Sequence, residues 1–150
     1  MYGITLMLHS YIRWLVLIVM CYGLIRAWWG LLRKREWLKA DDLTALAFTW
    51  VISLQFILGT ILFFIPSGIA QAAWQNFSIA MQVRDLRFFG LEHPLQMIIA
   101  LTIVHIGSAR ARKAEASARQ FRWAAICFTL ATVLILTAIP WWRPWLRGVL

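Results

Sequence analysis

The chain has 150 residues, of which 62% are hydrophobic and only 14% are charged, and 10 of them are tryptophan. This composition lies far outside the range of an ordinary soluble domain and indicates an integral membrane protein. The net charge of +9 could suggest nucleic acid as a partner, but the distribution of the basic residues argues against it. They stand in short clusters beside apolar runs rather than along a soluble face.

Four apolar runs span approximately residues 4–28, 43–65, 88–108 and 123–142; the third begins at either Leu86 or His93. Each run is long enough to cross a hydrocarbon layer of about 30 Å at about 1.5 Å per residue, the third only if the segment before Pro94 contributes. We therefore expect an all-α fold, a bundle of four transmembrane helices that forms a single domain over residues 1–150. Between the second and third runs, Ala70, Trp74, Phe77 and Met81 recur at helical spacing, which predicts a short amphipathic helix on the membrane interface.

The distribution of basic residues predicts the topology. The connections LLRKREWLKADD and ARARKAEASARQFR, together with Arg26, hold ten of the fifteen Lys and Arg residues. These connections are predicted to be cytoplasmic, so both termini should be periplasmic in a bacterial inner membrane. The periplasmic face would then keep Arg13, Arg84, Arg87, Arg143 and Arg147.

Ionisable residues stand at the opening of the third run. Glu92 and His93 directly precede Pro94, which cannot donate a backbone hydrogen bond and clashes with the carbonyl four residues earlier, so the helix either begins near His93 or kinks there and frees the carbonyl of Gly90. Ionisable groups at membrane depth are costly unless they are paired, hydrated or bound to a ligand. They are therefore candidates for a functional site.

Two histidines are predicted to lie at the same depth. His9 precedes Arg26 by seventeen residues, and His93 precedes Arg110 by seventeen, which places both imidazoles about 25 Å above the cytoplasmic boundary at about 1.5 Å per residue. The first and third helices run in the same direction, so the two rings can face each other across the bundle. This is the geometry of a single bis-histidine haem b. The alternative is that each histidine only hydrogen-bonds to backbone, headgroups or water.

Charged residues near this depth are candidates for the rest of the site. Arg13, Arg84 and Arg87 are predicted to meet the haem propionates. Glu92 would either pair with Arg13, which by itself would be a structural salt bridge, or accept a hydrogen bond from an imidazole.

Other polar and small residues complete the predicted set. Gln55 and Gly59 lie one turn apart in the second run, and the glycine would let a flat ring approach the backbone. His105 lies about 18 Å deeper than His93 at about 1.5 Å per residue. No other histidine shares its depth, so we expect it to make a polar contact near the cytoplasmic rim.

Four segments of the chain resemble a known group of proteins. HSYIRW (9–14), LQFILGTILFF (54–64), RFFGLEHPLQM (87–97) and HIGSARARK (105–113) resemble small four-helix bacterial membrane proteins labelled cytochrome b or cytochrome b-like. The resemblance implies haem b and electron transfer, with His9 and His93 as ligands and Arg13 and Glu92 beside them. The paired histidines that large dihaem cytochromes b carry on each of two helices are lacking.

Two main hypotheses follow, with a weaker third. The first is an electron-transfer protein or subunit with one haem b near the periplasmic side, which exchanges electrons with a quinol or a partner redox centre. The second is a structural subunit of a larger respiratory or photosynthetic membrane complex, without a cofactor or with a bound pigment. The third is an enzyme such as a quinone reductase, in which Glu92, His93, Arg13 and Gln55 would bind the quinone head group.

Overall fold

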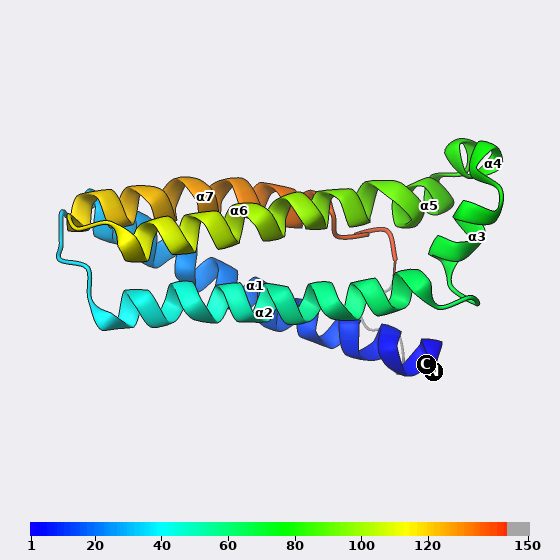
Figure 1. The fold of residues 1–150 in the computed structure, drawn as a ribbon, viewed down its shortest axis with the longest axis horizontal. Coiled ribbons are helices and arrows are strands. Elements are labelled where there is room, and N and C mark those ends of the chain that lie inside the picture. The colour runs from blue at the N-terminus through cyan, green and yellow to red at the C-terminus, as the bar shows by residue number, and fades with distance from the viewer. Residues whose placement is uncertain (144–150) are drawn as a thin grey trace.

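Four long helices form the body of the protein in the computed structural model, which describes residues 1–143. They are α1 (Tyr2–Leu32), α2 (Lys39–Phe64), α6 (His93–Lys113) and α7 (Ser117–Thr137), and they lie side by side along the long axis of the molecule (Figure 1). No strand occurs within residues 1–143. The predicted all-α bundle of four helices is confirmed.

These helices have the length and apolarity that a membrane requires. Four spans qualify: Tyr2–Leu32, Lys39–Phe64, Arg84–Lys113 and Ser117–Thr137. Large apolar side chains point outward from every one, as Ile18 (66% exposed), Trp50 (69%), Ile98 (49%) and Val133 (56%) illustrate. A helix that is apolar on its outer face as well as its inner face fits a lipid environment. The protein is therefore a multi-pass membrane protein.

The two ends of the bundle differ in chemistry. At the end that we call the basic end, residues 33–38 join α1 to α2 and residues 114–116 join α6 to α7 (Figure 1). Its exposed cations are Arg33, Lys34, Lys39, Arg110, Arg112, Lys113, Arg119 and Arg122. The N-terminus lies at the other end, which we call the histidine end. Arg147, which the sequence assigns to the same end as the N-terminus, lies outside the described residues.

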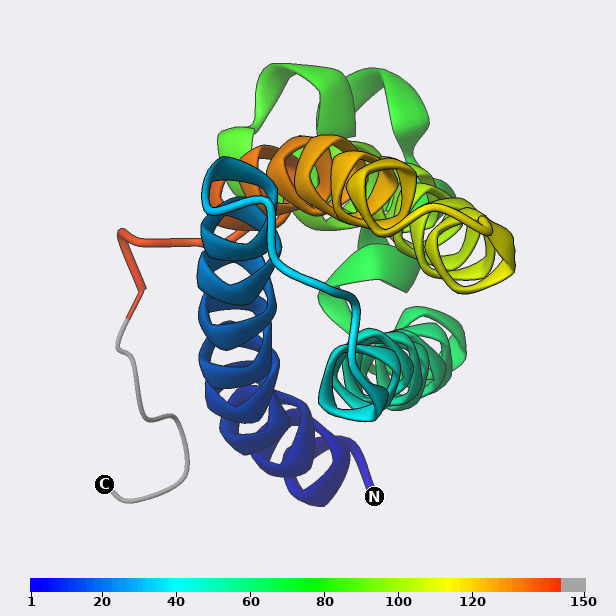
Figure 2. The same ribbon diagram turned by 90° about the vertical axis from the view of Figure 1, so that its left-hand side faces the viewer.

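The helices are arranged as a square. Helix α1 packs against α2 and α7, and α6 packs against the same two helices, so α1 and α6 occupy opposite corners (Figure 2). Buried Phe48 and Phe128 meet edge to face in the centre, with ring centres 5.1 Å apart. A Cβ atom on Gly107 would lie 2.3 Å from the Cβ of Cys127. Small residues therefore bring α6 and α7 into close contact, as is common between membrane helices.

The segment between α2 and α6 is helical as predicted, but it is divided into three short helices rather than one. They are α3 (Ile69–Gln75), α4 (Phe77–Gln82) and α5 (Arg84–Arg87), and they cover the histidine end (Figure 1). The break falls at Asn76, whose φ of −142° and ψ of 78° are not helical and whose side chain accepts a hydrogen bond from the amide of Ile79. Asparagine favours this capping role over the middle of a helix.

A π-helical turn, η1 (Phe88–Glu92), connects α5 to α6. The third span is therefore continuous from Arg84 to Lys113, and the wider turn before Pro94 takes the place of a break. The predicted exposed carbonyl of Gly90 accepts a hydrogen bond of 3.0 Å from the indole of Trp74 on α3. A Cβ atom on Gly90 would lie only 2.5 Å from the Cβ of Ala73. Helix α3 is thus held directly against the π-turn.

We expect Trp74→Phe to destabilise the histidine end, because it leaves the Gly90 carbonyl without its donor. The expected loss is about 1 kcal/mol of unfolding free energy, measured by titrating the detergent-solubilised protein with sodium dodecyl sulfate. Trp50→Phe is the control, since Trp50 is 69% exposed on the outer surface of α2. Equal stability of the two variants would contradict this account of the π-turn.

Candidate functional site

The structure brings His9 of α1 and His93 of α6 together across the bundle. Their ring centres are 6.2 Å apart, and the ring planes are inclined by 73°. The two residues belong to the helices at opposite corners of the square. The pair therefore bridges the interior of the bundle rather than a contact between neighbouring helices.

The ring of His93 is held by its surroundings. Its Nδ1 lies 2.8 Å from the carbonyl oxygen of Ala138, which follows α7. Because a carbonyl can only accept, Nδ1 carries the proton and Nε2 keeps a lone pair. The rings of Phe88 and Phe89 lie 5.7 and 6.3 Å from the His93 ring, centre to centre. In a neutral His93 imidazole, Nε2 is therefore the ring nitrogen that could bind a ligand.

His9 packs against α2. A Cβ atom on Gly59 would lie 3.2 Å from Cε1 of the His9 ring, so the absence of a side chain at Gly59 makes room for the imidazole. Gln55, one turn earlier, donates from Nε2 to the backbone carbonyl of His9 at 2.9 Å. The predicted neighbours Gln55 and Gly59 therefore both contact His9.

The distance between the rings suits one metal ion shared by both. With a metal–nitrogen bond of about 2.0 Å to each imidazole, and the ring centre about 1 Å beyond the nitrogen, two ligands on opposite sides of a metal have ring centres about 6 Å apart. The rings meet edge to face with an angle of 73° between their planes, so binding one metal ion requires the Nε2 atoms of both rings to turn toward the midpoint between them.

The rest of the donor set limits which metal species fits. Residues 1–143 contain no cluster of three or more His, Cys, Asp or Glu side chains arranged to hold a metal ion. A structural zinc ion needs four protein ligands. Two imidazoles suffice where the metal brings its other ligands with it, as iron does in a porphyrin. The pair thus fits a haem better than a bare ion.

Glu92 and the arginines are placed differently from the prediction. Glu92 accepts from Arg87 Nε at 2.7 Å, so its ion-pair partner is Arg87 and not Arg13. The guanidinium of Arg13 lies 5.6 Å from the ring centre of Trp14. Arg87 also donates to the carbonyl of Met81. Arg87 is close enough in sequence to reach Glu92 within the same continuous helix, which sequence reasoning overlooked.

A group that we call the outer clasp lies beside His93; its members are Asp85, Phe88, Phe89, Trp142 and Arg143. Asp85 forms an ion pair with Arg143 and accepts a hydrogen bond of 3.0 Å from the indole of Trp142. The ring of Trp142 lies 4.7 Å from that of Phe88, and Arg143 lies over Phe89. The outer clasp ties the segment after α7 to the start of the third span.

Arg84 also contacts the outer clasp, because its guanidinium lies 4.0 Å from the ring centre of Trp142. Both arginines of α5 therefore have protein partners at the histidine end. A role with propionates, as predicted for Arg84 and Arg87, would require them to leave or share those partners.

His105 lies away from the pair. Its Nε2 is 3.0 Å from the hydroxyl of Ser53 on α2. One turn further along α6, Ser108 donates to the carbonyl of Ala45. His105 thus takes part in a polar contact between α2 and α6 toward the basic end, in agreement with the role expected for it.

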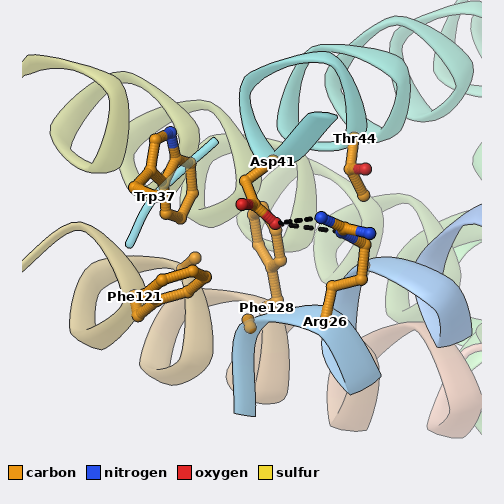
Figure 3. Close-up of a pocket in the computed structure, with 9 residues that line it drawn as sticks. Arg26, Trp37, Asp41, Thr44, Phe121 and Phe128 are labelled. Atoms are coloured by element: carbon orange, nitrogen blue, oxygen red, sulfur yellow. Dashed lines mark hydrogen bonds and ion pairs between the residues drawn. The ribbon is translucent and has the colours of Figure 1, made fainter. Parts of the chain in front are cut away.

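A second polar cluster, not predicted from the sequence, lies at the basic end. Asp41 is only 3% exposed and accepts from Arg26 at 2.9 Å, from Arg35 at 2.6 and 2.8 Å, and from the amide of Leu38 at 2.9 Å. Figure 3 shows Arg26 reaching from α1 to the Asp41 carboxylate beside a cavity of about 10 Å³ that Trp37, Phe121 and Phe128 help to line. This volume suits about one water molecule.

The Asp41 cluster is a structural lock rather than a ligand site. Its carboxylate joins α1, the 33–38 connection and the first turn of α2, and Arg26, Arg35 and the Leu38 amide donate hydrogen bonds to it. A signal was present in the sequence, since an acid three residues inside a helix caps its start. Pattern alone does not tell which arginines reach it.

Comparison with known proteins adds no assignment: no family model, no curated protein and no solved structure matches the chain. The fold and the site define the class, which is a four-helix membrane protein with a histidine pair across its interior. The geometry of that pair is the feature of the molecule that points to a function.

We expect Gly59→Leu to displace His9, because even a Cβ atom there would lie 3.2 Å from the imidazole. The result should be at least about a tenfold loss of affinity for any ligand that the pair holds, the scale of a disturbed metal-ligand orientation. Titration of the purified protein with haem, followed by absorbance, measures it. Gly3→Leu is the control, since a Cβ atom on Gly3 meets nothing within 4 Å; equal affinities would contradict the contact.

Proposed function

We propose that this protein is a haem b electron-transfer protein or subunit in which His9 and His93 are the two axial ligands of one haem. The observation that carries the proposal is the distance of 6.2 Å between the ring centres, which matches two imidazoles on one metal. Bound there, a haem supplies one-electron redox chemistry. The protein supplies the ligands, their orientation and an apolar surrounding.

The hydrogen bond made by His93 supports its proposed role as a metal ligand. His93 has its Nδ1 on the Ala138 carbonyl, which is the usual arrangement behind a metal-ligating histidine. The site also needs room for a flat ring. The cavity at this end of α1, lined by Arg13, Trp14, Leu17, Ile139, Pro140 and Trp141, measures only about 10 Å³ and is not lined by either histidine. Haem binding therefore requires α1 and α6 to admit the porphyrin between them, with Arg13, one turn after His9, as a candidate for a propionate.

The position of the pair limits the role. Both histidines lie toward one end of the bundle, and the other end carries the exposed basic residues. With the basic end in the cytoplasm, the haem lies near the periplasmic side of a bacterial inner membrane, and both termini are periplasmic. One haem at that depth does not carry an electron across the bilayer. We therefore propose a quinol or a partner redox centre as donor or acceptor, within a larger membrane complex.

The resemblance to small cytochrome b-like membrane proteins agrees with this proposal at its main points. His9 and Arg13 in HSYIRW, and Glu92 and His93 in RFFGLEHPLQM, are the positions that the resemblance assigns to the haem and its neighbours. Glu92 pairs with Arg87, so its part is to hold Arg87 beside the π-turn rather than to bind Arg13.

The test is an absorption spectrum of the protein purified in mild detergent from haem-replete cells, oxidised and then reduced, with iron and haem measured per chain. The proposal predicts one haem and one iron per chain and the spectrum of a low-spin b-type haem. A colourless protein that stays colourless after haem is added contradicts it and favours the structural-subunit alternative. A different metal in stoichiometric amount also contradicts it.

A further inference from the structure

The two candidate ligands, His9 and His93, differ in the hydrogen bonding of their Nδ1 atoms. His93 has a carbonyl partner for Nδ1, at 2.8 Å, whereas Nδ1 of His9 is buried and has no hydrogen-bond partner. Histidines that bind a metal almost always donate their other ring N–H to an acceptor, which fixes the tautomer and the ring orientation. If His9 binds a metal, a neighbouring group should accept the hydrogen bond from its Nδ1–H.

Gln55 carries a buried acceptor atom that also lacks a hydrogen-bond partner. The residue is 8% exposed, and its Oε1 is buried without a hydrogen-bond partner. The identity of that atom follows from its neighbour: the other end of the amide faces the His9 carbonyl at 2.9 Å, which requires a donor and therefore Nε2. A buried acceptor left without a donor costs about 1–3 kcal/mol.

His9 Nδ1 and Gln55 Oε1 both lie on the side of α1 that faces α2. Gln55 and Gly59 are one turn apart on α2, and a Cβ atom on Gly59 would lie 3.2 Å from Cε1 and 3.7 Å from Nδ1 of His9. The Cε1–Nδ1 edge of the imidazole therefore faces α2. Gln55 is anchored to the backbone of the same histidine, which keeps its amide on the α2 side that the Cε1–Nδ1 edge faces.

We infer that Gln55 is the positioning residue for His9: its Oε1 accepts the hydrogen bond from His9 Nδ1–H, through one bridging water or a small rotation of the imidazole, while Nε2 stays on the His9 carbonyl. This keeps His9 in the tautomer that leaves Nε2 free to ligate a metal. The inference deepens the proposed function and rests on it for the identity of the ligand. The tautomer itself is a property of the chain without any ligand.

The first experiment therefore uses the full chain without haem. Nitrogen-15 labelling of histidine, with the His9 signals assigned by their loss in His9→Ala, reports which ring nitrogen carries the proton in detergent micelles. We expect Nδ1–H as the major form in the wild type and in Gln55→Glu, which keeps an acceptor oxygen, and loss of that form in Gln55→Leu. A wild-type His9 protonated on Nε2, or a tautomer unchanged in Gln55→Leu, would overturn the inference.

Gln71→Leu is the matched control. Gln71 also donates from Nε2 to a backbone carbonyl, that of Phe63, at 2.9 Å, but it lies on α3 and has no bond to His9. The control removes the same kind of hydrogen bond, so the His9 tautomer should stay as in the wild type. A change as large as in Gln55→Leu would show a general effect of structure and overturn the assignment.

The second experiment measures the midpoint potential of the haem-loaded protein. A stronger acceptor on Nδ1–H makes the imidazole a better electron donor to iron, so Gln55→Glu should lower the potential and Gln55→Leu should raise it. A shift of the same sign in both variants would overturn the inference. If the wild type takes up no haem, the proposed function fails while the tautomer result stands, so the two failures are distinguishable. If Gln55→Leu does not fold, Gln55→Glu must still keep the tautomer and lower the potential.

Discussion

Replacing His9 or His93 by alanine is expected to abolish stoichiometric haem binding. Disturbing a partner of a metal ligand already costs about 10–100-fold in affinity, so removing a ligand should cost more than about 100-fold. Each variant deletes one of the two imidazoles whose ring centres are 6.2 Å apart. The measurement is the haem content per chain and the spectrum of the reduced protein after identical purification.

The third histidine supplies the control for this prediction. His105 contacts Ser53 rather than the pair, so His105→Ala should keep the wild-type haem content and spectrum. Retention of a full haem complement in both His9→Ala and His93→Ala would contradict the ligand assignment. Loss of haem in His105→Ala, with an intact fold, would contradict it as well.

Asp41→Ala should be the most destabilising single change at the basic end. The variant leaves two half-buried arginines, Arg26 and Arg35, without their shared carboxylate and removes the acceptor for the Leu38 amide. Breaking a buried ion pair by deleting one partner costs about 3–5 kcal/mol. We expect a loss of that size in the free energy of unfolding, followed by circular dichroism during a sodium dodecyl sulfate titration.

The adjacent residue Asp42 provides a matched comparison. It accepts one hydrogen bond, 2.9 Å from the indole of Trp37, so Asp42→Ala should cost about 1 kcal/mol. If Asp41→Ala is no more destabilising than Asp42→Ala, the Asp41 cluster is not the lock that we describe. Haem affinity should change little in either variant, because both residues lie at the end opposite to the histidines.

The sequence was sufficient for the membrane fold, because apolar length and the placement of Lys and Arg are direct consequences of the hydrocarbon layer. Equal spacing from Arg26 and Arg110 was enough to match His9 with His93, since helical rise converts residue number to depth. The same periodicity did not foresee the break at Asn76, because a local side-chain hydrogen bond there competes with helical continuation.

The long-range pairings of charged residues could not be read from the sequence. Glu92 meets Arg87 in its own helix, a pairing that their spacing in the sequence allows, whereas Asp85 meets Arg143 from the far end of the chain. Which arginine reaches Asp85 depends on how the residues after α7 meet the start of the third span, which composition does not reveal. The π-turn also depends on packing, since α3 and Trp74 stabilise it from outside.

The most direct test of the shared metal is X-ray diffraction from crystals of the haem-replete protein at the iron absorption edge. The account predicts one anomalous peak per chain, between the two imidazoles and about 2.0 Å from a nitrogen of each. A peak elsewhere, or an ordered His9–His93 pair with no iron between the rings, would contradict it.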